Sequence, residues 1–434
     1  MSFDSLADWL SWLEAQRPEH DMVLGLDRIG EVARRLLPEK LAPTVITVAG
    51  TNGKGSTVAL LDAMLSEGGL TVGAYTSPHL LRFNERVRIK GEMVSDHQLC
   101  EAFEQVNAAR DDTFLTYFEF ATLAALVIFS KSDLDVLLLE VGLGGRLDAV
   151  NIIEPDVAIV TTVALDHQQW LGNDIETIAA EKAGIYRREK PALFGDFPVP
   201  QSLLSVIDKI GAKPFLREND FAIERCNKGL IFRGTGSASE KVTLSGLVEP
   251  ELPLTSVACA LEAIQLLPYP ISVSAINAGL TKVAVAGRMQ KLQVRRQDGR
   301  EVTVILDVAH NPQAAQYLAE RLKTLMSEQR LTAVLAMLDD KDFGSVVNGF
   351  NDIFNEWHVA AVGYGPRALP AETLADHLIS RGQRVQCHEN VADALDAALE
   401  VDDETNTVVV FGSFHTVSES LQHLQDRERQ AQYE

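Results

Sequence analysis

A glycine-rich turn carries the residues best suited to chemistry. In VITVAGTNGKGSTVALL, residues 45–61, β-branched residues precede the turn and a helical pattern follows it. Backbone N–H groups and the positive end of a helix converge at such a turn, which favours a phosphate group. Lys54 adds a positive charge and Ser56 a hydroxyl for magnesium, although Gly55 between them departs from the standard P-loop pattern. The turn therefore predicts a nucleotide-phosphate site.

Polar residues also end three neighbouring strand-like runs. Ser77 ends TVGAYTS, Glu140 ends DVLLLE, and His167 ends VTTVALDH. In an open α/β sheet ligands gather at the carboxyl ends of the strands, so all three should lie beside the phosphate turn. They are candidate ligands for the Mg²⁺ of a nucleotide, although histidine is an unusual ligand for this cation.

Other candidates lie in loops and at strand ends. The turn GLGGRLDAVN carries Arg146 and Asp148, two opposite charges that would grip a polar ring or a carboxylate beside the metal. In FLTYFEFATLAAL, Phe118 is a candidate wall for an aromatic ligand. Asp307 and His310, in LDVAHNP, end a strand of the second half and should face a cleft.

Two series of alternating strands and helices must position these residues. The first occupies residues 45–200 and continues into a small β excursion over 215–250; the second begins after VAVAGRMQ. Such alternation predicts parallel sheets covered by helices. We therefore expect an α/β protein with an N-terminal P-loop-type, doubly wound domain over 1–286 and a smaller Rossmann-like α/β domain over 287–434.

Composition narrows the functional class. The 434 residues carry a formal net charge of −22, which disfavours nonspecific binding to nucleic acid. No apolar run approaches a membrane span, and the acidic, amphipathic N-terminus lacks the features of a secretory signal. The four cysteines lie far apart, which argues against a zinc site or a disulfide framework. We expect a cytoplasmic enzyme that acts on small molecules, with no membrane or nucleic-acid partner.

Nine motifs together resemble one family. GTNGKGS, TSPHLLRFNERVRI, TYFEF, EVGLGGRLDAVN, ALDHQQWLG, EKAGI, GRMQ, LDVAHNP and GSFHTV occur in this order over almost the whole chain. They resemble the folylpolyglutamate synthases, and most closely the bacterial bifunctional dihydrofolate synthase/folylpolyglutamate synthases of the Mur ligase superfamily. This resemblance implies ATP-dependent amide formation, with ATP and Mg²⁺ as cofactors.

The resemblance also implies roles for individual residues. The phosphates of ATP would be held by Asn52, Gly53, Lys54, Gly55 and Ser56, and other nucleotide groups by Arg288 and Asp307, so that ATP bridges both domains. The metal ligands implied are Ser77, Glu140 and His167. The implied pterin-binding residues are Met22, Val23, Leu24, Thr116, Tyr117, Phe118, Glu119, Leu147, Asp148 and Ala149.

Two positions need separate comment. Lys182, in a helix opened by Asn173 or Asp174, would by default be a surface lysine; the resemblance instead implies a carbamate that helps to organise magnesium. Relatives carry asparagine where LPLTSVACAL places Ser256, which puts a nucleotide contact in doubt.

The implied reaction proceeds through an acyl phosphate. ATP would phosphorylate the carboxylate of dihydropteroate, or of a reduced folate, and the amine of L-glutamate would then displace phosphate. Lys54 and Arg288 would neutralise the charge of the transferred phosphoryl group, and His310 would orient the phosphate or the incoming glutamate. We expect a monomer whose domains close over the site. Two alternatives stay open: a Mur-type ligase for a cell-wall nucleotide precursor, and a GTPase-like switch, for which the guanine-reading N-K-x-D motif is missing from the sequence.

Overall fold

The chain divides into two compact units. The computed structural model describes residues 3–16, 23–296, 298–325, 329–363 and 365–431. The units span Met1–Val283 and Ala284–Glu434, so the boundary expected at residue 287 lies close to the observed division. Each unit has its own sheet and its own core.

The first unit is built on an eight-stranded sheet with β1 near its centre. The strand order is β4-β3-β2-β5-β1-β6-β7-β8, and all pairs from β2 to β8 are parallel. The sequence TVITVA of β1 is buried at every position, as expected for a parallel strand that is covered on both faces. The strands are β1 (Thr44–Ala49), β2 (Val72–Tyr75), β3 (Val87–Ile89), β4 (Glu92–Met93), β5 (Val136–Glu140), β6 (Val157–Val160), β7 (Pro191–Phe194) and β8 (Lys213–Leu216).

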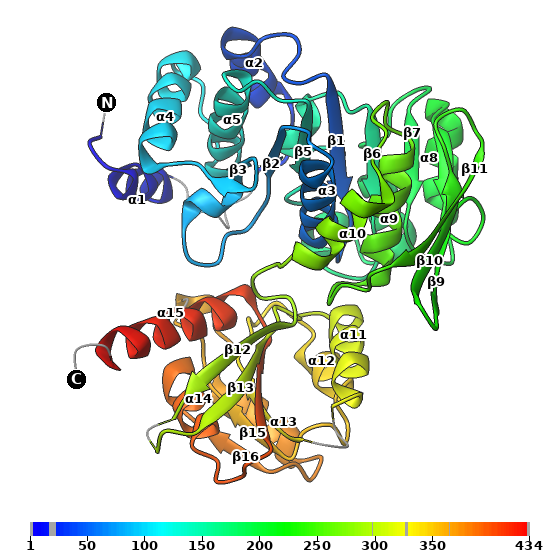
Figure 1. Ribbon diagram of the computed structural model, residues 1–434. Coiled ribbons are helices and arrows are strands. Elements are labelled where there is room, and N and C mark those ends of the chain that lie inside the picture. Colours follow the sequence, from blue (N-terminus) through cyan, green and yellow to red (C-terminus); the bar gives the residue numbers. More distant parts are fainter. Residues whose placement is uncertain (1–2, 17–22, 297, 326–328, 364, 432–434) are drawn as a thin grey trace. The chain divides into compact units, whose positions relative to one another are not determined.

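Helices cover both faces of this sheet. On one face α3 contacts β1, β2 and β5, α9 contacts β6 and β7, and both α9 and α10 pack against α3 (Figure 1). The other helices share a core with the opposite face. The bounds are α1 (Leu6–Gln16), α2 (Asp27–Leu36), α3 (Lys54–Glu67), η1 (Phe83–Arg86), α4 (Asp96–Arg110), α5 (Tyr117–Ser130), η2 (Ala149–Ile152), α6 (Gln168–Leu171), α7 (Ile175–Ala183), α8 (Gln201–Ile210), α9 (Leu254–Gln265) and α10 (Val273–Lys282).

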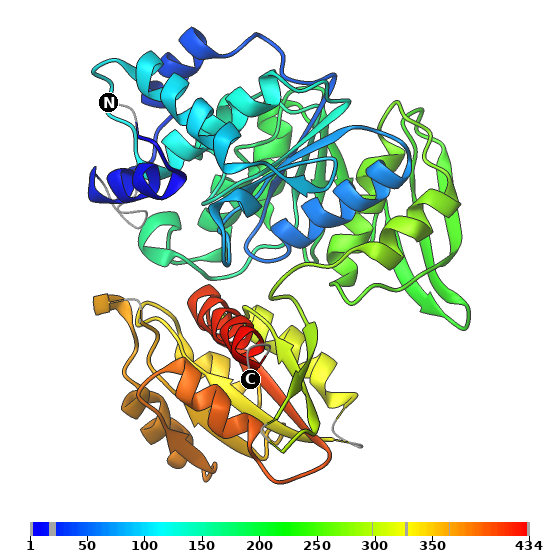
Figure 2. The ribbon, with the colours of Figure 1, turned by 60° about the vertical axis from the view of Figure 1, so that its left-hand side comes forward.

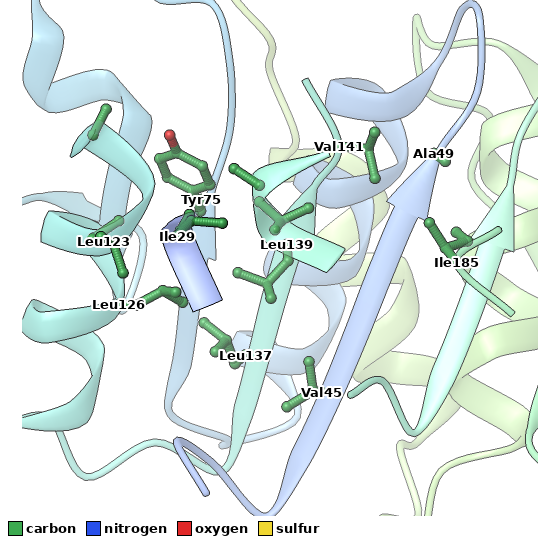
Figure 3. Packing of buried hydrophobic residues seen from close by; sticks show 14 of the residues in the cluster. Ile29, Val45, Ala49, Tyr75, Leu123, Leu126, Leu137, Leu139, Val141 and Ile185 are labelled. Atoms are coloured by element: carbon green, nitrogen blue, oxygen red, sulfur yellow. The ribbon is translucent and has the colours of Figure 1, made fainter. Parts of the chain in front are cut away.

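The core of this opposite face follows the alternation of the strands. Leu137 and Leu139 of β5 point towards Leu123 and Leu126 of α5, and Tyr75 of β2 lies between them (Figure 3). All five side chains are buried. This packing fixes the carboxyl ends of β1, β2 and β5, where the candidate site residues follow.

A separate antiparallel sheet forms the β excursion expected over residues 215–250. Its order is β11-β10-β9, and it belongs to the first unit. The strands are β9 (Ala222–Cys226), β10 (Gly229–Thr235) and β11 (Lys241–Leu247).

The second unit has a six-stranded sheet in the order β12-β13-β17-β14-β15-β16, parallel except between β12 and β13. Helices α11, α12 and α13 share a core with one face, and α14 and α15 contact the strands from outside that core (Figure 2, with α15 in red). The bounds are β12 (Gln290–Arg295), β13 (Glu301–Leu306), α11 (Pro312–Lys323), β14 (Arg330–Leu335), α12 (Phe343–Asn348), β15 (Glu356–Val359), η3 (Gly365–Arg367), α13 (Ala371–Ile379), β16 (Val385–Cys387), α14 (Val391–Leu399), β17 (Asn406–Phe411) and α15 (Phe414–Ala431).

His388 pairs with a histidine of β15. It is half-buried, and its Nε2 lies 3.0 Å from Nδ1 of His358 on β15. The two rings stack with centroids 5.1 Å apart. Burial lowers the pKa of both imidazoles, that of His358 to about 4, so the pair is neutral at pH 7.

No helix in the described parts of the chain is long and apolar enough to cross a membrane.

Candidate active site

The phosphate turn connects β1 to α3 and is fixed by two threonines after β6. Gly53 is the N-cap of α3 and has a φ of 85°, a conformation that favours glycine. Asn52 N–H donates to Thr162 Oγ1 at 3.0 Å, and the hydroxyls of Thr161 and Thr162 donate to the Asn52 carbonyl at 2.6 and 3.2 Å. The turn is therefore held open at the start of α3, where helix N–H groups favour an anion.

Lys54 and Ser256 contact the same turn. Nζ of Lys54, the first residue of α3, donates to the carbonyls of Gly50 at 3.0 Å and Thr51 at 3.4 Å. Buried Ser256 donates its hydroxyl to the Gly53 carbonyl at 3.3 Å, and a Cβ on Gly53 would lie 2.8 Å from that hydroxyl oxygen. Ser256 thus packs directly against the turn.

Glu140 lies between the turn and Ser77. Its buried carboxylate accepts the Ser77 N–H at 3.2 Å, and a Cβ on Gly55 would lie 3.5 Å from the same oxygen. His167 follows β6, on the other side of β1, and it is exposed. Oxygen ligands such as those of Ser77 and Glu140 fit Mg²⁺. The described residues contain no cluster of three or more His, Cys, Asp or Glu side chains arranged for a metal.

Asp148 organises the second glycine-rich turn. Its buried carboxylate accepts N–H groups from Leu143 at 2.8 Å and Val150 at 3.1 Å. Burial raises the pKa of Asp148 to about 6, although these hydrogen bonds and the charge of Lys54 act in the opposite direction. The charge of Lys54 thus acts on Asp148, whose pKa nevertheless stays above its ordinary value.

Lys182 is buried, not a surface residue. It lies in the last turn of α7, a helix capped by Asp174, and its backbone packs on the second glycine-rich turn at Gly145. Burial, and after it the positive charge of Lys54, lower the pKa of Lys182 to about 7, while Asp166 and Asp148 act in the opposite direction. A large fraction of this amine is neutral at pH 7, as a nucleophilic amine must be.

Three segments implied in pterin binding meet in the first unit. Thr116 caps α5, and Glu119 accepts the Thr116 N–H at 2.8 Å through one carboxylate oxygen. Its other oxygen accepts from Arg28 at 3.0 Å, and Arg28 also donates to the Val23 carbonyl at 2.8 Å. Gly25 N–H donates to the Leu147 carbonyl at 3.4 Å, next to Asp148 and Ala149. Leu24 lies in the same described segment, whereas Met22 lies outside the described residues.

Aromatic side chains lie next to these segments. The half-buried Phe118 ring lies over Gly142, where an added Cβ would be 2.6 Å from the ring, and 6.1 Å from the Tyr75 ring. The buried Tyr117 ring lies 5.7 Å from the guanidinium of Arg86. Phe118 therefore has the position of a wall beside Gly142, and Tyr117 packs inside.

In the second unit, Arg288, Asp307 and His310 gather at the end of β13. The buried carboxylate of Asp307 accepts N–H groups from Met289 and Ala309, both at 2.9 Å. Burial raises its pKa, while Arg288 and His310 favour the charged form. The Phe414 ring lies 5.4 Å from the Arg288 guanidinium and 6.4 Å from the His310 ring.

Sequence reasoning missed Arg28, Thr161, Thr162 and Phe414. The adjacent threonines end a buried strand, and Phe414 lies within the GSFHTV motif, so each had a detectable signal. Arg28 had none, because its partner Glu119 is 91 positions away.

Comparison with known proteins gives matches to both units. The Mur ligase middle domain family matches residues 48–194, and the Mur ligase glutamate ligase domain family matches residues 287–414. The dihydrofolate synthase/folylpolyglutamate synthase of Escherichia coli K12 is 41% identical over 97% of this chain and 96% of its own length. That of Haemophilus influenzae is 40% identical over 95% of this chain and 96% of its own.

Solved structures match with the same coverage. Escherichia coli FolC in complex with DHPP and ADP is 40% identical, covers 98% of this chain and 99% of its own, and has a TM-score of 0.90. The bifunctional enzyme of Yersinia pestis, complexed with AMPPNP and a Mn ion, is 42% identical, covers 97% of this chain and 98% of its own, and has a TM-score of 0.88.

Proposed function

Because the chain belongs to the dihydrofolate synthase/folylpolyglutamate synthase family, we infer that it is an ATP-dependent ligase for folate synthesis. It joins L-glutamate to 7,8-dihydropteroate and adds further glutamates to reduced folates. Relatives of this name match over nearly the full length, so the alternatives of a cell-wall precursor ligase and a GTPase-like switch are dropped. The phosphate turn at the start of α3, clamped by Thr161 and Thr162, carries our assignment of the site.

The nucleotide is assigned to the phosphate turn in the first unit. We propose that Asn52, Gly53, Lys54, Gly55 and Ser56 hold its phosphates, which the start of α3 and the threonine clamp support. Arg288 and Asp307 of the second unit are proposed to hold other nucleotide groups; the charge of Arg288 acts on the buried Asp307, and the Phe414 ring lies beside Arg288. His310 is proposed to orient phosphate or glutamate.

A divalent cation is assigned to Ser77, Glu140 and His167. The buried carboxylate of Glu140 beside Gly55 fits a hard cation, and the hydroxyl of Ser77 is nearby. When bound, Mg²⁺ neutralises charge on the phosphates. His167 is exposed and follows β6, which lies on the other side of β1 from the strand of Glu140.

The reaction follows from the need for a leaving group. A carboxylate oxygen of dihydropteroate attacks the γ-phosphorus of ATP, the bond to ADP breaks, and an acyl phosphate forms. The amine of glutamate then attacks the acyl carbon, inorganic phosphate leaves, and the amine loses a proton. Lys54 stabilises the charge that develops on the transferred phosphoryl group, and Arg288 is proposed to assist from the second unit.

The pterin end of the substrate is assigned to Val23, Leu24, Thr116, Tyr117, Phe118, Glu119, Leu147, Asp148 and Ala149. The meeting of these segments in the first unit supports this assignment.

We further propose a cytoplasmic monomer. All four cysteines are free thiols, a state typical of a reducing compartment, and one chain supplies every assigned residue.

A phosphate-release assay tests the function. We expect release from ATP when L-glutamate and either dihydropteroate or tetrahydrofolate are present, and little release when either is omitted. Release that is supported instead by a UDP-linked sugar precursor, with no response to dihydropteroate, would refute the assignment.

Asp148 should distinguish the two substrates. Dihydropteroate and a glutamylated folate present carboxylates at different distances from the pterin, so one pterin pose cannot serve both. We expect Asp148→Ala to lower kcat/KM for dihydropteroate by about 1.5–3 kcal/mol, the range for a hydrogen bond to a charged group. The loss for tetrahydrofolate should be smaller. Asp148→Asn, which keeps one acceptor oxygen for the turn, is the control for loosening of Leu143 and Val150.

Parallel kinetics on both substrates decide between two roles of Asp148. Equal losses would mean that Asp148 serves a step common to both reactions, and the two-pose account would be wrong.

A further inference from the structure

One guanidinium joins the segments that the pterin assignment requires. Arg28, in the first turn of α2, donates through Nη2 to the Val23 carbonyl at 2.8 Å and to Glu119 Oε1 at 3.0 Å. Its side chain is 32% exposed and that of Glu119 is 4% exposed. Arg28 Nε is buried and has no hydrogen-bond partner among the described residues. The charge of Glu119 is therefore compensated inside the protein by Arg28.

The segment that Arg28 holds has no regular structure of its own. Residues 23–25 form neither helix nor strand, so hydrogen bonds to other elements must fix their position. Two such bonds are the Val23 carbonyl with Arg28 and the Gly25 N–H with the Leu147 carbonyl. These bonds connect the segment to α5 through Glu119 and to the turn before η2, and α2, α5 and η2 contact one another.

Glu119 is occupied by the protein itself. Oε2 accepts the Thr116 N–H at 2.8 Å while Oε1 accepts from Arg28. Its carboxylate thus links the cap of α5 to α2. The distance between Val23 and Thr116 therefore depends on the Arg28–Glu119 ion pair. A ligand that contacts both residues would be sensitive to this distance.

We propose that Arg28 is a positioning residue for the pterin end of the substrate, setting the separation of residues 23–24 from Thr116 and Glu119. This inference rests on the proposed function. Arg28 acts through Val23 and Glu119 without touching the reacting atoms. Loss of the guanidinium frees residues 23–24, and the substrate must then order them on binding. Pterin substrates should lose affinity, whereas ATP, held at the phosphate turn, should not.

The test compares Arg28→Met with Arg330→Met in the full-length protein. Arg330 is a matched control: it is 26% exposed, pairs with Glu356 at 3.1 Å, and has a buried Nε without a hydrogen-bond partner in the described chain, but it lies in β14 of the second unit. KM and kcat are measured for dihydropteroate and for ATP, with the thermal midpoint. Arg28→Lys is the second variant, since an ammonium keeps the charge but lacks the guanidinium fork.

We expect Arg28→Met to raise KM for dihydropteroate by roughly 10- to 100-fold, the equivalent of losing a hydrogen bond to a charged group, and to leave KM for ATP within about twofold. Arg28→Lys should fall between wild type and Arg28→Met, and Arg330→Met should change neither KM. If Arg28→Met does not fold, the elevated KM of Arg28→Lys carries the test.

Three outcomes would overturn the proposal. They are an unchanged KM for dihydropteroate in a folded Arg28 variant, an equal rise in both KM values, and the same pattern in Arg330→Met. Each of these outcomes is measured against a wild-type enzyme that turns over dihydropteroate, so each would leave the proposed ligase function intact. A wild-type protein that shows no glutamate-dependent turnover of dihydropteroate would instead refute the proposed function itself.

Discussion

Lys54→Ala should abolish ATP turnover while leaving the thermal midpoint close to that of the wild type. Lys54 is the first residue of α3, it is half-buried, and its ammonium donates to the carbonyls of Gly50 and Thr51 in the turn. Its removal takes a positive charge from the place where the transferred phosphoryl group develops negative charge. Positioned charges of this kind change phosphoryl transfer by roughly 10³-fold or more, about 4 kcal/mol.

The matched control is Lys282→Ala. Lys282 pairs with Glu67 at 2.6 Å, at the opposite end of α3, and its side chain is 68% exposed. Phosphate release and the thermal midpoint are measured together for both variants. Turnover near the wild-type rate in Lys54→Ala would disprove the assignment of the phosphate turn.

Lys182→Ala should be nearly inactive, because we propose that Lys182 reacts with dissolved CO₂. Its neutral amine forms a bond to the carbon of CO₂ and releases a proton, so that a buried neutral amine becomes a carbamate anion. The pKa of about 7 makes this reaction accessible at neutral pH. Acetate should partly restore the variant by occupying the vacated space with a carboxylate.

The pKa of Lys182 also sets a direction for the pH dependence. As the pH falls through about 7, a growing fraction of the amine is protonated and cannot react with CO₂, so activity should fall as the pH is lowered and return with added bicarbonate as the pH is raised. Lys190→Ala is the control, since Lys190 is a 46% exposed lysine paired with Asp156 at 2.8 Å. Lys182→Ala with more than about a tenth of wild-type activity, a loss below roughly 1.4 kcal/mol, would show that the carbamate is not essential.

The sequence predicts the central strands well and the edge strands poorly. TVITVA, and NTVVVF after its first asparagine, are continuous β-branched or apolar runs, and they become β1 and β17, which are buried at every position. Strand β12, QKLQVR, lies at a sheet edge and alternates partly buried and exposed residues. Its charged residues are equally typical of an exposed loop or helix, so its sequence does not identify it as a strand. Strands β3 and β4 form the antiparallel end of the first sheet, and with three and two residues they are too short to give a sequence pattern.

For the site, local motifs predicted the turns but not the electrostatic environment. The glycines around Lys54 are adjacent in sequence, so their turn was visible from the sequence. The depressed pKa of Lys182 arises from burial and from Lys54, 128 positions away, and neither is encoded in EKAGI. Arg28 was missed for the same reason, because its importance follows from a tertiary contact with Glu119.

Transfer of oxygen from substrate to phosphate tests the central claim most directly. Dihydropteroate labelled with ¹⁸O in its carboxylate is incubated with the enzyme, ATP and L-glutamate, and the inorganic phosphate is analysed by mass spectrometry. Because the carboxylate oxygen that attacks ATP leaves with the phosphate, the acyl-phosphate route predicts one ¹⁸O atom in each phosphate released. Unlabelled phosphate formed together with dihydrofolate would contradict that route.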